Sequence, residues 1–123
     1  MKLSKAEEQL MHFLWKLKKA FMKDLISAYP PPQPKATTVA TLLKRMQDKG
    51  FVAYKKYGSV REYHPVVSKA AYFQDHLDEM IDNYFDSSTA EFASFFTAQS
   101  KLTEEQLLEL KAIIDKQLES KKK

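Results

Sequence analysis

The pattern of hydrophobic and polar positions in the first part of the chain predicts three helices. Ser4 and Glu7 form an S-x-x-E capping box, which predicts a first helix over residues 5–18. A shorter helix is expected over 21–28, because the prolines that begin at Pro30 cannot continue it. The third helix has the clearest apolar stripe, with i, i+3, i+4 and i+7 spacing, formed by Val39, Leu42, Leu43 and Met46.

The two glycines of the chain mark the end of the third helix and a turn. Gly50 lies where the residue after a helix needs a positive φ. Gly58 separates 51–57 from 60–64, two segments rich in β-branched and aromatic residues, which predicts a β-hairpin that turns at 57–59. A Gly-Ser turn is less diagnostic than Asn-Gly, so an irregular loop is the alternative. Three helices followed by a hairpin are the plan of a winged helix, a mainly α fold with a small β-hairpin.

The rest of the chain predicts three further helices. Ser68 is expected to cap a helix over about 69–85, and two capping boxes open the others, Ser88 with Glu91 and Thr103 with Gln106. Short helices with this much apolar surface do not easily bury it alone, so we expect a homodimer, with packing on the N-terminal half as the alternative. The candidate dimerisation residues are Phe73, Leu77, Met80, Ile81, Tyr84, Phe92, Phe95, Phe96, Leu107, Leu110 and Ile114.

Charge divides the chain into two parts with different expected roles. The net charge is +4, but residues 1–66 hold thirteen Lys or Arg against five Asp or Glu, a balance of +8. Residues 67–123 hold seven Lys against eleven Asp or Glu, a balance of −4. A basic half favours a polyanionic partner. We therefore expect a winged-helix DNA-binding domain at 1–66 and a helical dimerisation domain at 67–123.

The polar side of the third helix is the candidate surface for reading DNA. Threonine can contact phosphates, bases or a thymine methyl, arginine can form paired hydrogen bonds with guanine, and basic residues of a hairpin can contact phosphates. Taken alone, each of these charges is more ordinary as solvated surface. The candidate residues are Thr37, Thr38, Thr41, Lys44 and Arg45 on the helix, with Lys55, Lys56 and Arg61 on the hairpin.

Signals for catalysis, metals and cofactors are weak. The absence of cysteine excludes disulfides, thiolate zinc sites and a cysteine nucleophile, and two glycines leave no phosphate-binding loop. His12, His64 and His76 are scattered, and the single His76-x-x-Glu79 motif is typical of a solvated acidic face. We expect no enzyme activity, no catalytic residues, no metal and no cofactor. No apolar run of membrane-spanning length and no secretory signal is seen, so a cytoplasmic location without a membrane partner is expected.

Four segments together resemble the penicillinase and methicillin-resistance repressor family (BlaI/MecI/CopY type). The segment TTVATLLKRMQDKGFV (37–52) is similar to the family's recognition helix. Its first helix, wing and last helix are matched in order by LSKAEEQLMHFLW (3–15), YKKYGSVREYHPVVS (54–68) and KLTEEQLLELKAIID (101–115). The resemblance implies a homodimeric winged-helix transcriptional repressor of dyad operators with TACA/TGTA-like half-sites.

Two family features are missing from this chain. The copper-responsive members carry a C-terminal cysteine pair, and this chain has no cysteine. The antibiotic-responsive members are inactivated through a membrane sensor and cleavage between an Asn and a Phe; the corresponding position here is Phe95-Phe96, without the Asn. The resemblance therefore does not supply an upstream protease or sensor. A second hypothesis, independent of the resemblance, is a helical protein-interaction adaptor whose basic face binds an acidic partner.

Overall fold

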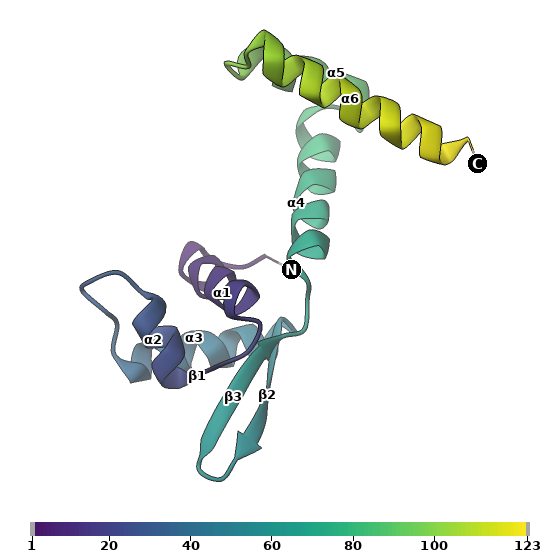
Figure 1. Ribbon diagram of the computed structural model, residues 1–123. Coiled ribbons are helices and arrows are strands. Elements are labelled where there is room, and N and C mark those ends of the chain that lie inside the picture. The colour runs from purple at the N-terminus through teal and green to yellow at the C-terminus, as the bar shows by residue number, and fades with distance from the viewer. Residues whose placement is uncertain (1, 123) are drawn as a thin grey trace. The chain divides into compact units, whose positions relative to one another are not determined.

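The computed structural model describes residues 2–122, and the chain forms two compact units, Met1–Gln74 and Asp75–Lys123. The first unit combines helices with a small sheet, and the second is helical (Figure 1). Helix α4 begins in the first unit and ends in the second. In chain order the elements are α1 (Lys5–Leu17), β1 (Ala20–Phe21), α2 (Met22–Ala28), α3 (Ala36–Asp48), β2 (Val52–Tyr57), β3 (Val60–Pro65), α4 (Lys69–Tyr84), α5 (Thr89–Gln99) and α6 (Glu104–Lys121).

The predicted mainly α winged-helix architecture is confirmed, and local sequence signals explain the ends of its helices. At α1, the Glu7 amide donates to the Ser4 hydroxyl over 3.2 Å, and the Ser4 amide donates to the Glu7 carboxylate over 2.7 Å. At the end of α3, Gly50 has a φ of +82°. The Phe51 amide then donates to the Met46 carbonyl over 2.9 Å, which closes the helix end in the manner of a Schellman motif.

One core buries the inner sides of α1, α2 and α3 and the base of the hairpin. Burial of a Leu or Met side chain stabilises a fold by about 1.5–3 kcal/mol, so the apolar stripe of α3 holds that helix with its other side in solvent. Leu42, the fourth residue of the predicted stripe, is only half-buried against this core. The buried residues include Leu10, Met11, Leu14, Leu25, Val39, Leu43, Met46, Phe51, Val52, Tyr63 and Tyr72.

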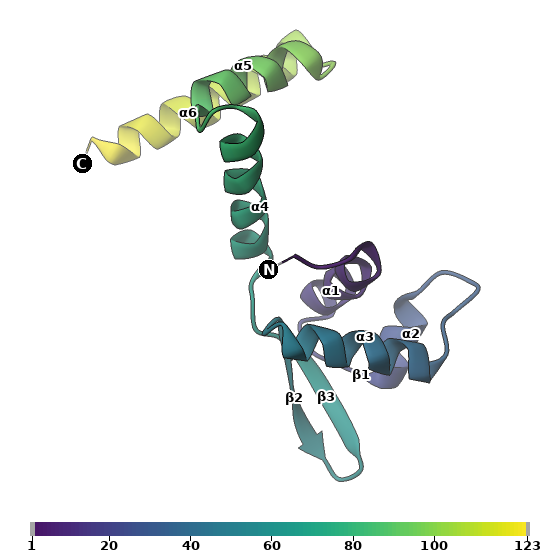
Figure 2. The same cartoon turned by 180° about the vertical axis from the view of Figure 1, so that it is seen from behind.

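The predicted hairpin is confirmed, and a third strand that the sequence analysis missed completes the sheet. The strand order is β1-β3-β2 with antiparallel pairing, and α3 lies beside the end of the hairpin away from its turn (Figure 2). Tyr57 pairs with Val60, so the turn contains Gly58 and Ser59 alone. Gly58 has a φ of +64° and Ser59 does not share the left-handed region, as in a type II′ turn.

Strand β1 also shifts the start of the second helix from the predicted residue 21 to Met22. Ala20 pairs with Tyr63 and Phe21 with Glu62. The Phe21 amide donates to the Asp24 carboxylate over 3.0 Å, which satisfies a donor at the helix start. The short strand joins the helical part of the unit to the hairpin.

The two units divide after Gln74, whereas the charge pattern of the sequence predicts a boundary between 66 and 67. The first six residues of α4 belong to the first unit, where Tyr72 is buried with its ring 5.6 Å from Trp15 and 5.7 Å from Phe51. The Tyr72 hydroxyl donates to the Glu8 carboxylate over 2.7 Å. Upstream of α4, the Trp15 indole donates to the carbonyl of Val67 over 2.9 Å.

The second unit contains the end of α4 with α5 and α6. The Phe85 ring lies 5.5 Å from both Phe92 and Phe95, and Phe92 stacks on Phe96 at 6.1 Å. Ile81 is buried, at 9% exposure. Both expected helix starts carry caps: Ser88 accepts from the Glu91 amide, and Thr103 and Gln106 form the complete predicted box.

Candidate nucleic-acid interface

Helix α3 presents a polar side to solvent opposite its buried stripe. All five residues proposed for this side from the sequence are exposed, whereas Val39, Leu43 and Met46 are at most 1% exposed. Contacts of α3 with α1, α2 and β2 hold the helix in this orientation. The exposed residues are Thr37, Thr38, Thr41, Lys44 and Arg45.

The five side chains differ in how much hydrogen-bonding capacity they leave for a ligand. The Thr41 hydroxyl donates to the Thr37 carbonyl over 2.9 Å, so its methyl group and lone pairs remain for an external contact. Lys44 forms an exposed ion pair with Asp48 at 3.1 Å. Arg45 has no ion-pair partner among residues 2–122, so its full set of donors is open to a ligand.

The wing places its basic residues on two different faces. Directly paired residues of antiparallel strands project to the same face, and successive residues alternate between faces. Lys56 pairs with Arg61, so one face carries two cations side by side. Lys55 pairs with Glu62 on the other face, where the acidic partner reduces the local potential. Lys56 and Arg61 are therefore the better-placed pair for phosphates.

Tyr54 is a support for this surface that the sequence analysis missed. The guanidinium of Arg61 lies over the Tyr54 ring, 4.3 Å from its centroid, and Tyr54 in turn packs 5.7 Å from the buried Tyr63. A guanidinium over an aromatic ring keeps its charge and loses rotational freedom. An aromatic residue two positions before Lys56 shares its strand face, which is the sequence signal that could have found it.

The C-terminal end of α3 is held by a buried ion pair that sequence reasoning also missed. The Lys49 ammonium lies 2.7 Å from Oε1 of Glu7, whose side chain is 2% exposed, and it also donates to the Lys2 carbonyl over 3.1 Å. Burial alone would raise the pKa of Glu7, but hydrogen bonds from Lys49 and Ser4 bring that pKa below its ordinary value. The carboxylate is thus charged at neutral pH and links the start of α1 to the end of α3.

Most of the candidate dimerisation residues lie in the second unit, and they divide into exposed and packed groups. Phe73 differs from the others, because it belongs to the first unit and packs 6.2 Å from Trp15 and 6.1 Å from His12. Ile81 is buried within its own unit, and Leu77, Phe92 and Leu110 are half-buried. The exposed ones are Met80, Tyr84, Phe95, Phe96, Leu107 and Ile114.

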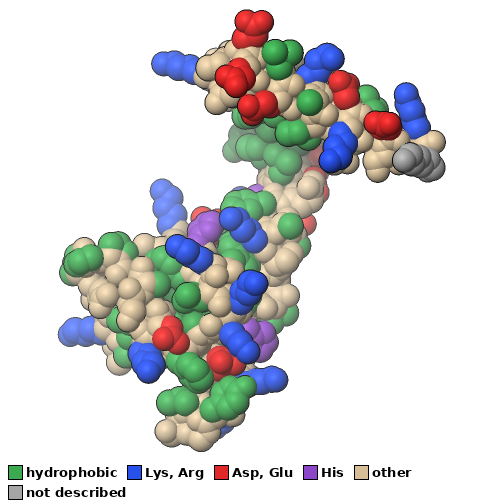
Figure 3. All heavy atoms as spheres, in the orientation of Figure 1, with side chains coloured by type: hydrophobic (Ala, Val, Ile, Leu, Met, Phe, Trp, Pro, Cys, Tyr) green, Lys and Arg blue, Asp and Glu red, His purple; other side chains and the backbone are tan. Residues whose placement is uncertain are grey.

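The basic character of the first unit is visible on its surface. Over the face shown in Figure 3, blue Lys and Arg side chains are more numerous than red acidic ones on this unit. Within residues 2–122, no group of three or more His, Asp or Glu side chains is arranged to hold a metal ion. None of the helices in that range is long and apolar enough to cross a membrane.

The family model of the penicillinase repressor matches residues 3–116, nearly the whole chain. The chain belongs to the penicillinase repressor family. It is therefore a DNA-binding transcriptional regulator and not an enzyme, which favours the DNA-binding hypothesis over the adaptor. No curated protein matches the sequence.

Two solved structures are similar to this penicillinase repressor family member at low sequence identity. A crystal structure of a mutant MarR from E. coli is 11% identical, with a TM-score of 0.50, and the match covers 95% of this chain and 79% of that one. A second is an organohalide-sensing transcriptional regulator, RdhR, in its 2,4-dichlorophenol-bound form. It is 17% identical with a TM-score of 0.48, over 94% of this chain and 62% of that one.

Proposed function

We propose that this protein is a homodimeric transcriptional repressor that binds a dyad operator, with α3 in the major groove and the wing along the phosphate backbone. The observation that carries the proposal is the two-sided character of α3. Its apolar stripe is buried, while Thr38 and Arg45 on the other side are exposed. The same unit carries the paired cations Lys56 and Arg61 on the wing.

Dimerisation is assigned to the second unit because that unit exposes more large apolar side chains than a helical monomer normally does. Along α6, Leu108, Ile113, Ile114 and Leu118 are each between 55% and 60% exposed. An exposed apolar surface of this kind is typical of a protein–protein interface, and most homodimers use a two-fold one. Two copies of α3 would then read two half-sites, so the preference of the dimer for its operator over other DNA would be the product of the preferences of the two copies.

The charge division fits the same assignment. Residues 67–123 carry a balance of −4, which keeps that part from binding phosphate, whereas residues 1–66 carry +8. We include a cytoplasmic location in the proposal, since a repressor acts where its operator is.

The test is a fluorescence-anisotropy titration of the full chain against two duplexes, one with a dyad of TACA/TGTA-like half-sites and one with the same bases permuted. The wild type should prefer the dyad by about a thousandfold or more. Arg45→Ala should lose about 1–3 kcal/mol on the dyad and much less on the permuted duplex, because a base contact is lost. Equal binding of the two duplexes by the wild type would contradict the proposal.

Two substitutions provide controls for the loss of charge. Arg61→Ala removes the same charge from the wing and should weaken both duplexes alike, since phosphate contacts are independent of sequence. Lys101→Ala, at an exposed position of the second unit, should leave both affinities unchanged. If Arg45→Ala behaves like Lys101→Ala, α3 does not read the operator.

A further inference from the structure

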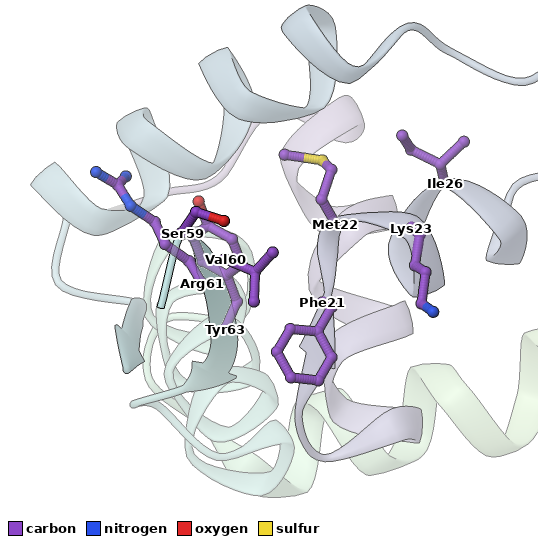
Figure 4. Close-up of a pocket in the computed structure, with 8 residues that line it drawn as sticks. All are labelled: Phe21, Met22, Lys23, Ile26, Ser59, Val60, Arg61 and Tyr63. Atoms are coloured by element: carbon purple, nitrogen blue, oxygen red, sulfur yellow. The ribbon is translucent and has the colours of Figure 1, made fainter. Parts of the chain in front are cut away.

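Two of the cavities in the first unit are lined by residues within 2–122, and the larger of these two borders the wing already described. It has a volume of about 760 Å³ and lies between α2 and the wing, with Phe21, Met22 and Val60 among its lining residues (Figure 4). The charged end of Arg61 points away from these apolar side chains, and its guanidinium lies over Tyr54. Lys23 is the other charged residue of the lining, so the cavity offers at most one side-chain charge to a ligand.

The second cavity, which we call the α1 cavity, has a different lining. Its volume is about 640 Å³, within the range of small-molecule sites. Residues from the second half of α1 form most of it, together with the last residue of α2 and the first residue of α4. Its apolar walls are Phe13, Trp15, Leu17 and Ala28, and its polar side chains are His12, Lys16 and Lys69.

Contacts within the protein hold both aromatic side chains of the α1 cavity in place without a ligand. Trp15 donates its indole N–H to the Val67 carbonyl over 2.9 Å. Phe13 packs edge-to-face on Tyr29 at 4.8 Å. The His12 ring meets Trp15 edge-on at 5.4 Å. Aromatic surfaces held in place in this way bind a planar ring without an ordering penalty.

The charges around the α1 cavity are all positive. Lys16 and Lys69 have no acidic partner among residues 2–122, and the lining contains no Asp or Glu. The Lys69 ammonium lies 5.9 Å from the centroid of the Phe73 ring, which itself packs 6.2 Å from Trp15. Two cations next to fixed aromatic walls complement a ligand that is both flat and negatively charged.

We propose that the α1 cavity binds an aromatic organic anion of the aryl carboxylate class. The ring of the ligand packs against Trp15, and its carboxylate accepts hydrogen bonds from Lys16 and Lys69. None of the residues proposed for DNA contact lines this cavity. The ligand proposal and the operator proposal can therefore fail independently.

The probe for the test is naphthoate, added to the full chain and followed by calorimetry and by two-dimensional amide NMR. Trp15 is the only tryptophan, so its indole N–H gives one resolved signal from a residue that lines the cavity. Naphthoate should bind with a dissociation constant below about 1 mM and shift that signal. The neutral analogue naphthalenemethanol should bind about tenfold more weakly or worse, because it lacks the charge.

Charge-removing variants locate the site. Lys16→Gln and Lys69→Gln should each weaken naphthoate about three- to tenfold, since each removes one charge-assisted hydrogen bond. Both lysines are exposed, so the variants should keep the helical circular dichroism of the wild type. The matched control is Lys23→Gln, which removes the same charge from the lining of the larger cavity and should leave the affinity unchanged.

Three results would overturn the proposal. The first is no heat and no shift of the Trp15 signal at millimolar naphthoate. The second is equal binding of naphthalenemethanol, which would show that charge is irrelevant. The third is an equal loss of affinity in Lys23→Gln and Lys69→Gln, which would show that general positive charge, and not the α1 cavity, attracts the anion.

Discussion

Replacing Lys49 by methionine tests whether the buried ion pair holds α3 in place. The substitution keeps the length and apolar stem of the side chain but removes the ammonium that lies 2.7 Å from Oε1 of Glu7. Oε1 would retain the amide of Ser4 as a donor, at 2.7 Å. Oε2 is already buried without a hydrogen-bond partner among residues 2–122. The variant therefore leaves a carboxylate in the core with its counter-charge gone.

Removing one partner of a buried ion pair typically costs about 3–5 kcal/mol. Lys49 is 29% exposed and Glu7 2%, so water can reach the vacated position and reduce the penalty. We expect Lys49→Met to lower the free energy of unfolding of the first unit by about 2–3 kcal/mol. Lys44→Met is the matched control, because Lys44 pairs with Asp48 in full exposure and its loss should cost at most about 0.5 kcal/mol.

The assay is urea unfolding followed by fluorescence. Trp15 is the only tryptophan of the chain and lies in the first unit, so its emission reports on that unit. Adding Glu7→Gln to Lys49→Met removes the orphaned charge and should recover about 1 kcal/mol or more. If Lys49→Met costs no more than Lys44→Met, the ion pair does not hold α3 and the reasoning is refuted.

The difference in unfolding free energy between the wild type and Lys49→Met should depend on pH with a definite sign. The hydrogen bonds from Lys49 and Ser4 outweigh the effect of burial and lower the pKa of Glu7 below 4.5 in the folded chain. Because the pKa of Glu7 is lower in the folded than in the unfolded chain, the ionised carboxylate stabilises the fold fully at pH values above its unfolded-state pKa. That stabilisation is lost as the pH falls through the folded-state pKa. The stability gap between wild type and Lys49→Met should therefore be constant near neutrality and narrow below about pH 4.5.

Three further predictions follow from the wing, the second unit and α4. Lys56→Ala should reduce the magnitude of the slope of log DNA association constant against log salt concentration by about 0.9 on any duplex. Lys55→Ala should reduce it by less, because the cross-strand partner of Lys55 is acidic. Ile114→Glu, at 59% exposure, should convert dimer to monomer in sedimentation without loss of helicity, whereas Ile81→Asp, at 9%, should unfold the second unit. Tyr72→Phe removes the hydrogen bond to Glu8 and should lower the free energy of unfolding in urea by about 1 kcal/mol. Burial, and then the hydrogen bond to Glu8, raise the pKa of Tyr72 to about 12, so this cost should persist below pH 10 and vanish as the pH rises through 12.

The helix ends and the winged-helix plan were predictable because their causes are local. The Ser4–Glu7 and Thr103–Gln106 boxes each involve residues three positions apart, and each is present. The turn at Gly58 follows from a positive φ that glycine tolerates. Signals of this range can be recognised without knowing which elements pack together.

Apart from Tyr54, the features missed from the sequence depend on contacts between distant segments. Strand β1 is two residues long, so no alternation marks it, and it exists because β3 offers an unpaired edge. The pair of Glu7 with Lys49 joins residues 42 positions apart. The place of Phe73 is decided by the aromatic rings of α1. Tertiary packing, and not propensity, determines each of these.

If the wing binds phosphates as we propose, two neighbouring rungs of the hairpin combine the requirements of folding and of binding. In the rung of Lys55 and Glu62, opposite charges face each other, as in a sheet built for stability. In the next rung, Lys56 and Arg61 place like charges side by side, which works against the folded hairpin. An approaching polyanion removes that repulsion, so the free wing is electrostatically frustrated and the bound wing is not. The first unit thus gives up some stability when alone, at the rung where a phosphate would restore it.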